Sequence, residues 1–288
     1  MSFSKGLVLA ALVGAVCFPV ADGALLLRYD FDDGTTPTAD SGTGPAANGT
    51  LIGAGSSFIA NTPSGTGRAY STSGANAYIT TGTTASPDTG TNPSKLDSLN
   101  AFTLTMWLNI QAQPATNDRL VSDWSGDAGF DLRVGSNVTS TDYRPLLQVN
   151  NSLASPTSNI GGFGSWVFLA VTYDGSQLSS NVLFYTGGTS SAATQFGSAV
   201  ALFQNNTDPT PDEPEGAVLA NSVDFQVGGS AATTSDRSPN AFFDDVRVYD
   251  EVLSVAQLEA IRLENVPEPS LGSLALLTLA GLATRRRR

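Results

Sequence analysis

The chain has 288 residues, a formal net charge of −12 and no histidine. The lack of imidazole excludes Ser-His-Asp and Cys-His catalysis and histidine-ligated zinc. The acidic balance argues against nucleic-acid binding, because phosphate contacts require a basic surface.

Residues 1–23 have the pattern of a secretory signal peptide. Lys5 supplies the positive charge, residues 7–20 form an apolar run, and Ala21-Asp22-Gly23 offers a small-x-small cleavage site. The alternative is a buried N-terminal helix. Cys17 is the only cysteine, so the mature chain is expected to contain no disulfide, although export would permit one.

Between the two chain ends, short β-rich runs alternate with Ser, Thr, Gly and Asn. Residues 101–110 alternate strictly, which is the pattern of a half-buried strand. The apolar face of this strand is formed by Phe102, Leu104, Met106, Leu108 and Ile110. The other predicted strands are 25–31, 77–80, 119–124, 130–134, 166–173, 181–185, 223–228 and 242–250, with 119–134 and 166–185 as hairpins. Many short strands with almost no helix predict a two-sheet antiparallel β-sandwich.

The stretch from residue 242 onward organises the domain. A strand rich in β-branched and aromatic residues contains the adjacent carboxylates Asp244 and Asp245. Such a pair is costly unless one member is paired or coordinates a cation. Ser254 is expected to cap a short helix whose apolar face is formed by Val255, Leu258 and Ile261.

The sequence Phe243-Asp244-Asp245-Val246-Arg247-Val248-Tyr249 and the helix after it resemble the closing elements of LamG-like, concanavalin A-type jelly rolls. Tyr29-x-Phe31-Asp32-Asp33-Gly34 is similar to the opening of such domains. The runs FTLTMWLN (102–109) and WVFLAVTYDG (166–175) resemble their central strands, in the expected order. The resemblance implies one jelly-roll domain over residues 24–265.

This resemblance also implies a structural Ca²⁺ ion that ties the ends of the domain together. Asp244 matches the closing-strand ligand, Asp40 is the N-terminal candidate, and Asp30 is a weaker third. Carboxylate and carbonyl oxygens are the ligands that calcium prefers. The alternative is that Asp244 and Asp245 face solvent or pair with Arg247.

Trp124 is the candidate carbohydrate-binding residue. It lies beside Asp123 and Asp127 at a glycine-containing turn, and lectins of this architecture combine an exposed aromatic ring with polar side chains. The alternative is an ordinary core or rim tryptophan. Trp107 and Trp166 are not expected to bind ligand.

The chain end combines three features: Pro267-Glu268-Pro269, an apolar run over 271–283, and Arg285, Arg286, Arg287 and Arg288. Together they resemble the PEP-CTERM sorting signal over residues 266–288. The resemblance implies an exosortase-type sorting enzyme as partner and a short apolar helix held transiently in the inner membrane. The exported protein would then reach the cell surface or extracellular matrix. A plain C-terminal membrane anchor is the alternative.

The sequence thus predicts an exported, non-catalytic LamG-like module that binds carbohydrate or another surface protein. The alternative is a carbohydrate-active enzyme with an unrecognised carboxylate pair. The Glu-x-Asp-x-x-Glu pattern of laminarinase-like enzymes with this fold is absent. The acidic segment 212–216, which contains Glu213 and Glu215, is expected to be a solvated insertion.

Overall fold

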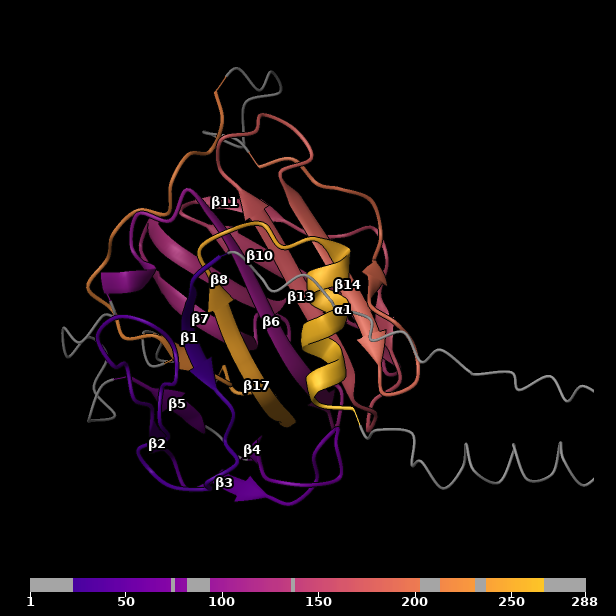
Figure 1. Cartoon of the computed structure of the whole chain (residues 1–288). Helices are drawn as coiled ribbons and strands as arrows, with labels where there is room; N and C mark the ends of the chain where they lie inside the picture. The colour runs from indigo at the N-terminus through magenta and orange to yellow at the C-terminus, as the bar shows by residue number, and fades with distance from the viewer. Residues whose placement is uncertain are drawn as a thin grey trace, which may run out of the picture.

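The computed structural model describes residues 23–73, 76–81, 94–135, 138–202, 213–230 and 237–266. Two antiparallel sheets face each other, and one helix lies on the outside of the larger sheet (Figure 1). The predicted all-β, two-sheet antiparallel sandwich of the jelly-roll type is therefore confirmed.

The eight-stranded sheet has the order β15 (Thr194–Gln195), β14 (Val182–Gly188), β13 (Val167–Asp174), β6 (Ala101–Ile110), β17 (Ala241–Tyr249), β4 (Ala69–Thr72) and β3 (Ser56–Ile59), and β1 (Leu25–Tyr29) also pairs with β17. The seven-stranded sheet has the order β11 (Ser152–Ala154), β10 (Pro145–Val149), β8 (Ala128–Val134), β7 (Arg119–Ser125), β16 (Gln226–Val227), β5 (Tyr78–Thr80) and β2 (Thr50–Ile52). The other described elements are the β9 (Asp142–Tyr143) and β12 (Ile160–Gly161) pair, the 3-10 helix η1 (Ser94–Leu96) and α1 (Val255–Glu264).

The alternation of β6 decides which of its side chains form the core. Phe102, Leu104 and Met106 are fully buried between the two sheets, as their period of two predicts. Trp107, on the opposite face, is also fully buried, but it belongs to a second apolar cluster outside the sandwich. Both faces of β6 are therefore covered.

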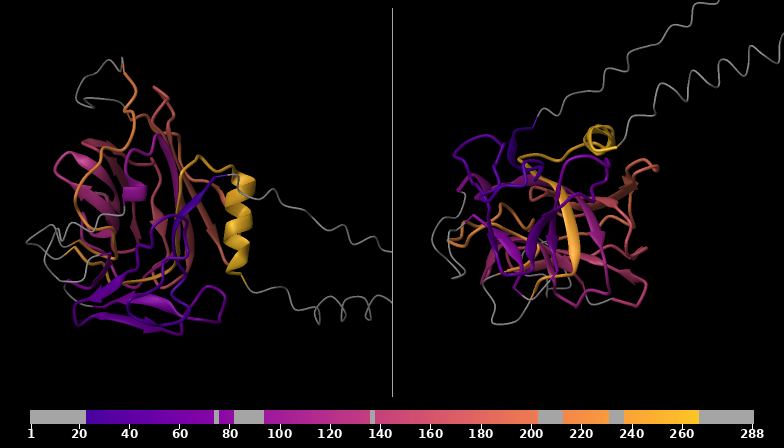
Figure 2. Two further views of the ribbon diagram at one scale, coloured as in Figure 1. Left: turned by 60° about the vertical axis from the view of Figure 1, so that its left-hand side comes forward. Right: turned by 90° about the horizontal axis from the view of Figure 1, so that it is seen from below.

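The helix α1 provides the cover for that outer face (Figure 2). Leu258 and Ile261 pack with Trp107, Phe168 and Tyr185 in the second cluster. A helix on one face of a sheet buries apolar side chains that would otherwise face water.

At the start of α1, the predicted cap is confirmed, but the predicted apolar face is only partly correct. Ser254 caps the helix, and Ser254 and Gln257 form a reciprocal capping box. Val255 is 45% exposed, so its predicted place on the buried face is wrong. Leu253, which precedes the cap, is buried in the second cluster instead, where its main-chain amide donates to Thr103 Oγ1 at 2.9 Å.

Both predicted hairpins are present, since β7 pairs with β8 and β13 pairs with β14. Two predicted strands are shorter than expected. The strand predicted at 25–31 ends at Tyr29, because Phe31 has a positive φ of 60° that leaves the extended region. The strand predicted at 223–228 is reduced to β16.

Strand β17 lies at the centre of the eight-stranded sheet. It pairs with β6 along one edge and with β4 and then β1 along the other. The register with β6 shifts between Asp244 and Arg247, and Asp245 has φ of 47°. This bulge gives the two adjacent carboxylates different environments.

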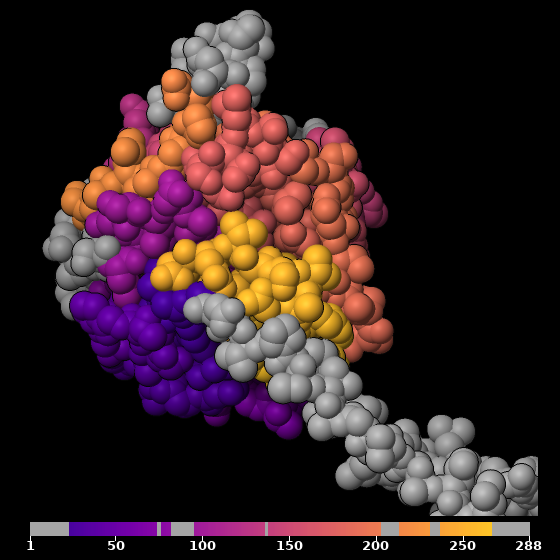
Figure 3. Space-filling view, turned by 45° about the horizontal axis from the view of Figure 1, so that its top comes forward, coloured from indigo at the N-terminus to yellow at the C-terminus, as the bar shows by residue number. Residues whose placement is uncertain are grey.

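The first described residues lie against the loop between β17 and α1. The amide of Gly23 donates to Glu251 Oε1 at 2.5 Å, and that of Ala24 donates to Asp250 Oδ1 at 2.7 Å. The N-terminal residues and the helix accordingly border each other on one face of the molecule (Figure 3). The fold itself thus joins the two ends of the domain.

Candidate functional site

The outer face of the seven-stranded sheet is polar. On β7, β8 and β10, the core positions Val121, Leu132 and Leu147 alternate with Ser122, Asp131 and Gln148. Cross-strand register places Ser122 opposite Asp131, and Asp131 opposite Gln148. Because successive side chains of a strand point to opposite faces, these three form one polar row on the face away from the core, where all three are buried.

Trp124 lies two residues beyond Ser122 on β7 and so faces the same outer side. Its ring is half-buried, and its indole Nε1 donates to the Asn150 main-chain carbonyl at 2.6 Å. The guanidinium carbon of Arg119 lies 5.6 Å from the ring centroid, within the range of a cation–π contact. The predicted carbohydrate-binding residue is therefore held in one orientation beside the polar row.

Asn150, in the turn between β10 and β11, is the residue that fixes Trp124. It adopts a left-handed conformation with φ of 51°, which asparagine tolerates well. Its side-chain amide donates to Glu215 Oε1 at 3.1 Å and its Oδ1 accepts from the Leu219 amide at 2.8 Å. Glu215 also accepts from Ser152 Oγ at 2.7 Å.

The contacts of Glu215 correct one expectation. Glu215 was expected in a solvated insertion, but it is only 8% exposed. Its carboxylate satisfies the polar groups of the β10–β11 turn, and this makes it part of the scaffold behind Trp124. The sequence offered no local cue, because its partners lie more than sixty residues away along the chain.

Asp131 is a fully buried carboxylate paired with arginine. Its Oδ2 accepts from Arg119 Nη1 at 2.5 Å, and its Oδ1 lies 3.6 Å from Arg133 Nε. Burial raises the pKa of Asp131 to about 6, while Arg119, Arg133 and Arg237 act in the opposite direction. The cluster Arg119–Asp131–Arg133–Arg237 therefore carries more positive than negative charge.

Asp123, the sequence neighbour of Trp124, does not face the outer side of the sheet. It pairs in register with Phe130 and is fully buried, and neither carboxylate oxygen has a hydrogen-bond partner. Burial, together with Asp97 and Asp224, raises the pKa of Asp123 well above its ordinary value, while the Asn221 side chain acts in the opposite direction. Asp123 therefore lies on the face opposite to Trp124, although the two are neighbours in the sequence.

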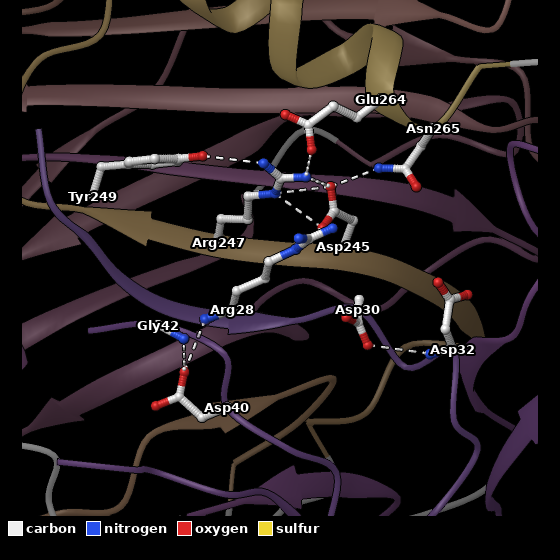
Figure 4. A network of polar contacts seen from close by, with 10 residues as sticks. All are labelled: Arg28, Asp30, Asp32, Asp40, Gly42, Asp245, Arg247, Tyr249, Glu264 and Asn265. Atoms are coloured by element: carbon white, nitrogen blue, oxygen red, sulfur yellow. Dashed lines mark hydrogen bonds and ion pairs between the residues drawn. The ribbon is translucent and has the colours of Figure 1, made fainter. Parts of the chain in front are cut away.

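A second polar site lies at the bulge of β17 (Figure 4). Asp245 accepts from Arg28 Nε at 2.8 Å, from Arg247 Nε at 2.9 Å and from Asn265 Nδ2 at 2.6 Å. Arg247 also pairs with Glu264 at 2.5 Å. The predicted alternative, pairing with Arg247, holds for Asp245, and the network joins β1, β17 and the C-terminal end of α1.

Asp244 has a different environment from Asp245. It is 4% exposed, and no lysine or arginine in the described ranges forms an ion pair with it. Burial, with Asp245, Asp32 and Asp30 nearby, raises the pKa of Asp244 to about 8. Such a group is stabilised either by a proton or by a bound cation.

Of the three residues predicted to bind calcium, Asp244 and Asp30 lie near each other, and Asp40 has other partners. Asp40 accepts from the amides of Arg28, Gly42 and Ala47 at 2.8–3.1 Å and pairs with Lys95. Burial raises the pKa of Asp40, but the Lys95 ammonium and the three amides more than offset this and lower it overall.

No group of three His, Cys, Asp or Glu residues in the described part of the chain has a metal-binding arrangement. A cation at Asp244 would therefore need main-chain carbonyls or water among its ligands, and calcium accepts both. Asp32, whose amide is 3.3 Å from Asp30 Oδ1, lies close enough to raise the pKa of Asp244 and is a third acidic residue here that sequence reasoning missed.

Two facing antiparallel sheets, an outer helix and a polar sheet face define a jelly-roll β-sandwich. A sequence profile of the laminin G-type family, described as the concanavalin A-like lectin/glucanases superfamily, matches residues 73–259. The match covers more than half of the chain, which belongs to this family. No curated protein matches the sequence significantly.

Solved structures share this fold at low sequence identity. Domain 4 of AbnA, a GH43 extracellular arabinanase from Geobacillus stearothermophilus, in complex with arabinotriose, is 16% identical with a TM-score of 0.52, covering 83% of this chain and 98% of that domain. Trypanosoma rangeli sialidase in complex with sialic acid is 14% identical with a TM-score of 0.52, covering 85% of this chain. The match spans only 33% of the sialidase. These likenesses show the fold alone.

Proposed function

We propose that the chain is a non-catalytic carbohydrate-binding module. The observation that carries this proposal is Trp124, a half-buried ring that Asn150 fixes beside the buried polar row of Ser122, Asp131 and Gln148. A partly exposed aromatic face with a fixed orientation suits stacking on a sugar ring. The structure of domain 4 of AbnA with arabinotriose supports the proposal, because that domain has the same fold and nearly the same extent.

A carbohydrate-active enzyme is the alternative function. Asp131, with its pKa raised to about 6 by burial, has the property expected of a general acid. Glycoside hydrolysis would need a second carboxylate on the other side of the scissile bond. The pairing of Asp131 with Arg119 and Arg133 favours a structural or binding role instead.

Replacing Trp124 tests the proposed site. Trp124→Ala is expected to weaken oligosaccharide binding at least tenfold, or about 1.4 kcal/mol, because the stacking surface is lost. The measurement is titration calorimetry with an oligosaccharide selected on a glycan array.

Trp166→Ala is the matched control. Trp166 is also half-buried, but it lies beside the eight-stranded sheet, where its Nε1 bonds Asn61 Oδ1 at 3.1 Å. Its substitution is expected to leave affinity unchanged. Equal losses of affinity in the two variants would contradict the assignment of Trp124 to the binding site.

We further propose that a structural calcium ion binds at Asp244, near Asp30 and Asp32. The raised pKa of Asp244 and the absence of a cationic partner among the described residues support this proposal. Binding to the folded state alone would stabilise the domain by mass action. Asp40 remains a predicted ligand, although its hydrogen bonds already occupy both of its oxygens.

Export and surface display are also part of the proposal. The predicted signal peptide lies outside the described residues except for Gly23, and the predicted sorting signal lies outside them except for Val266. In the described ranges, no helix has the length and apolar character needed to cross a bilayer. Mass spectrometry of the protein from its native cell is expected to show loss of residues 1–23 and a processed C-terminus; the mass of the full chain would contradict both.

A further inference from the structure

The outer face of the seven-stranded sheet gathers three arginines from separate segments of an acidic chain. Arg119 belongs to β7, Arg133 pairs with it in register on β8, and Arg237 precedes β17. The Arg119 amide donates to the Arg237 carbonyl at 2.8 Å, which holds this segment against the sheet. All three guanidinium groups lie close enough to Asp131 to lower the pKa of its carboxyl group.

The arginine cluster contains hydrogen-bonding capacity that the described residues do not use. The Nε atoms of Arg119 and Arg237 are buried without a hydrogen-bond partner, whereas Arg133 Nε and Asp131 Oδ1 form an ion pair with each other at 3.6 Å that is too long for a hydrogen bond. Buried polar groups in folded proteins normally have partners, so several unpaired donors in one place indicate a missing acceptor. A bound anionic group would provide acceptors for these donors.

The cluster remains accessible from outside the sheet. The side chain of Arg133 is 12% exposed, and Arg237 and Trp124 are half-buried. Arg119 lies beneath, between Asp131 and the Trp124 ring. A ligand that stacks on Trp124 would therefore find guanidinium groups beside it.

We infer that this face recognises an acidic saccharide, with the carboxylate of a uronate residue bound by Arg133 and Arg237 while its ring stacks on Trp124. The planar guanidinium fork matches a carboxylate in two parallel hydrogen bonds, which a lysine ammonium cannot do. The inference rests on the proposed carbohydrate-binding function and names its ligand class.

The test compares three probes on the purified chain: an oligogalacturonate, a neutral arabino-oligosaccharide of equal length, and a sulfated dextran. The wild-type protein is expected to bind the oligogalacturonate at least tenfold more tightly than the neutral probe. Arg133→Gln and Arg237→Gln are expected to remove this preference while neutral binding stays within twofold. Arg133→Lys, which keeps the charge but loses the fork, is expected to lose most of the preference as well.

Arg68→Gln is the matched control, because Arg68 is exposed and precedes β4 in the other sheet. Thermal melting of each variant establishes that it is folded. Equal affinity for the acidic and neutral probes would overturn the inference and leave the proposed function intact. Binding to none of the three probes would also overturn the inference, and the absence of binding to every oligosaccharide on the glycan array would overturn the proposed function as well. Acidic binding that is unchanged in the arginine variants, or binding to sulfated dextran alone, would also overturn it.

Discussion

Asp245→Asn is expected to lower the free energy of unfolding by about 3 kcal/mol, as when one partner of a buried ion pair is removed. Asp245 is 2% exposed and pairs with Arg28 and with Arg247, which is itself buried. Without the carboxylate, two guanidinium groups lose their shared anion. Urea unfolding at pH 7 gives the difference directly.

The choice of asparagine separates the effect of the lost charge on stability from any effect of backbone strain. Asp245 has a φ of 47°, and asparagine adopts this left-handed conformation as readily as aspartate. Asp127→Asn, at an exposed turn, is the control with the same charge change. A loss no larger than that of the control would mean that the network at the bulge does not stabilise the fold.

Asp244→Asn is expected to stabilise the calcium-free protein at pH 8 by about 2–5 kcal/mol. The folded-state pKa is about 8, against an ordinary value of 3.8. Between these values the folded state retains a proton that the unfolded state has released, so the wild-type protein loses stability as the pH rises from about 4 to 8. Asparagine removes this loss, and the two proteins should differ little at pH 4.

Calcium should reverse the order of stability of the wild-type protein and the Asp244→Asn variant. Wild type is expected to melt at a higher temperature with calcium than with a chelator, and Asp244→Asn should show the same midpoint in both. Calorimetry at pH 7 measures this difference. An unchanged melting midpoint of the wild-type protein would contradict the cation site. A difference in the free energy of unfolding between variant and wild type that stays constant from pH 4 to 8 would contradict the raised pKa of Asp244.

The strands were predictable where one chain segment carries the whole pattern. The strict alternation of residues 101–110 matches β6 at both ends, and its apolar face is the core face. Strands such as β4 and β10 were missed, because their short runs contain Ser, Thr or Pro and are held by neighbours far apart in sequence. Pairing, rather than local propensity, makes these segments strands.

The candidate site was predictable only in part, for the same reason. Trp124 could be proposed from its turn, but its neighbours Arg119, Asp131 and Arg133 come together through the register of β7 and β8. A bulge follows Arg119 in that register, so the outward positions could not be assigned by counting alone. The sequence also presents Asp244 and Asp245 as equivalent, whereas the bulge of β17 pairs one with arginine and leaves the other among acidic residues.

The central claim, a jelly-roll module that binds carbohydrate without cleaving it, is tested most directly by following binding and product release on the same panel of oligosaccharides. The account predicts saturable binding with every oligosaccharide recovered at its original length. Shorter products that disappear when Asp131 is replaced by asparagine would contradict it.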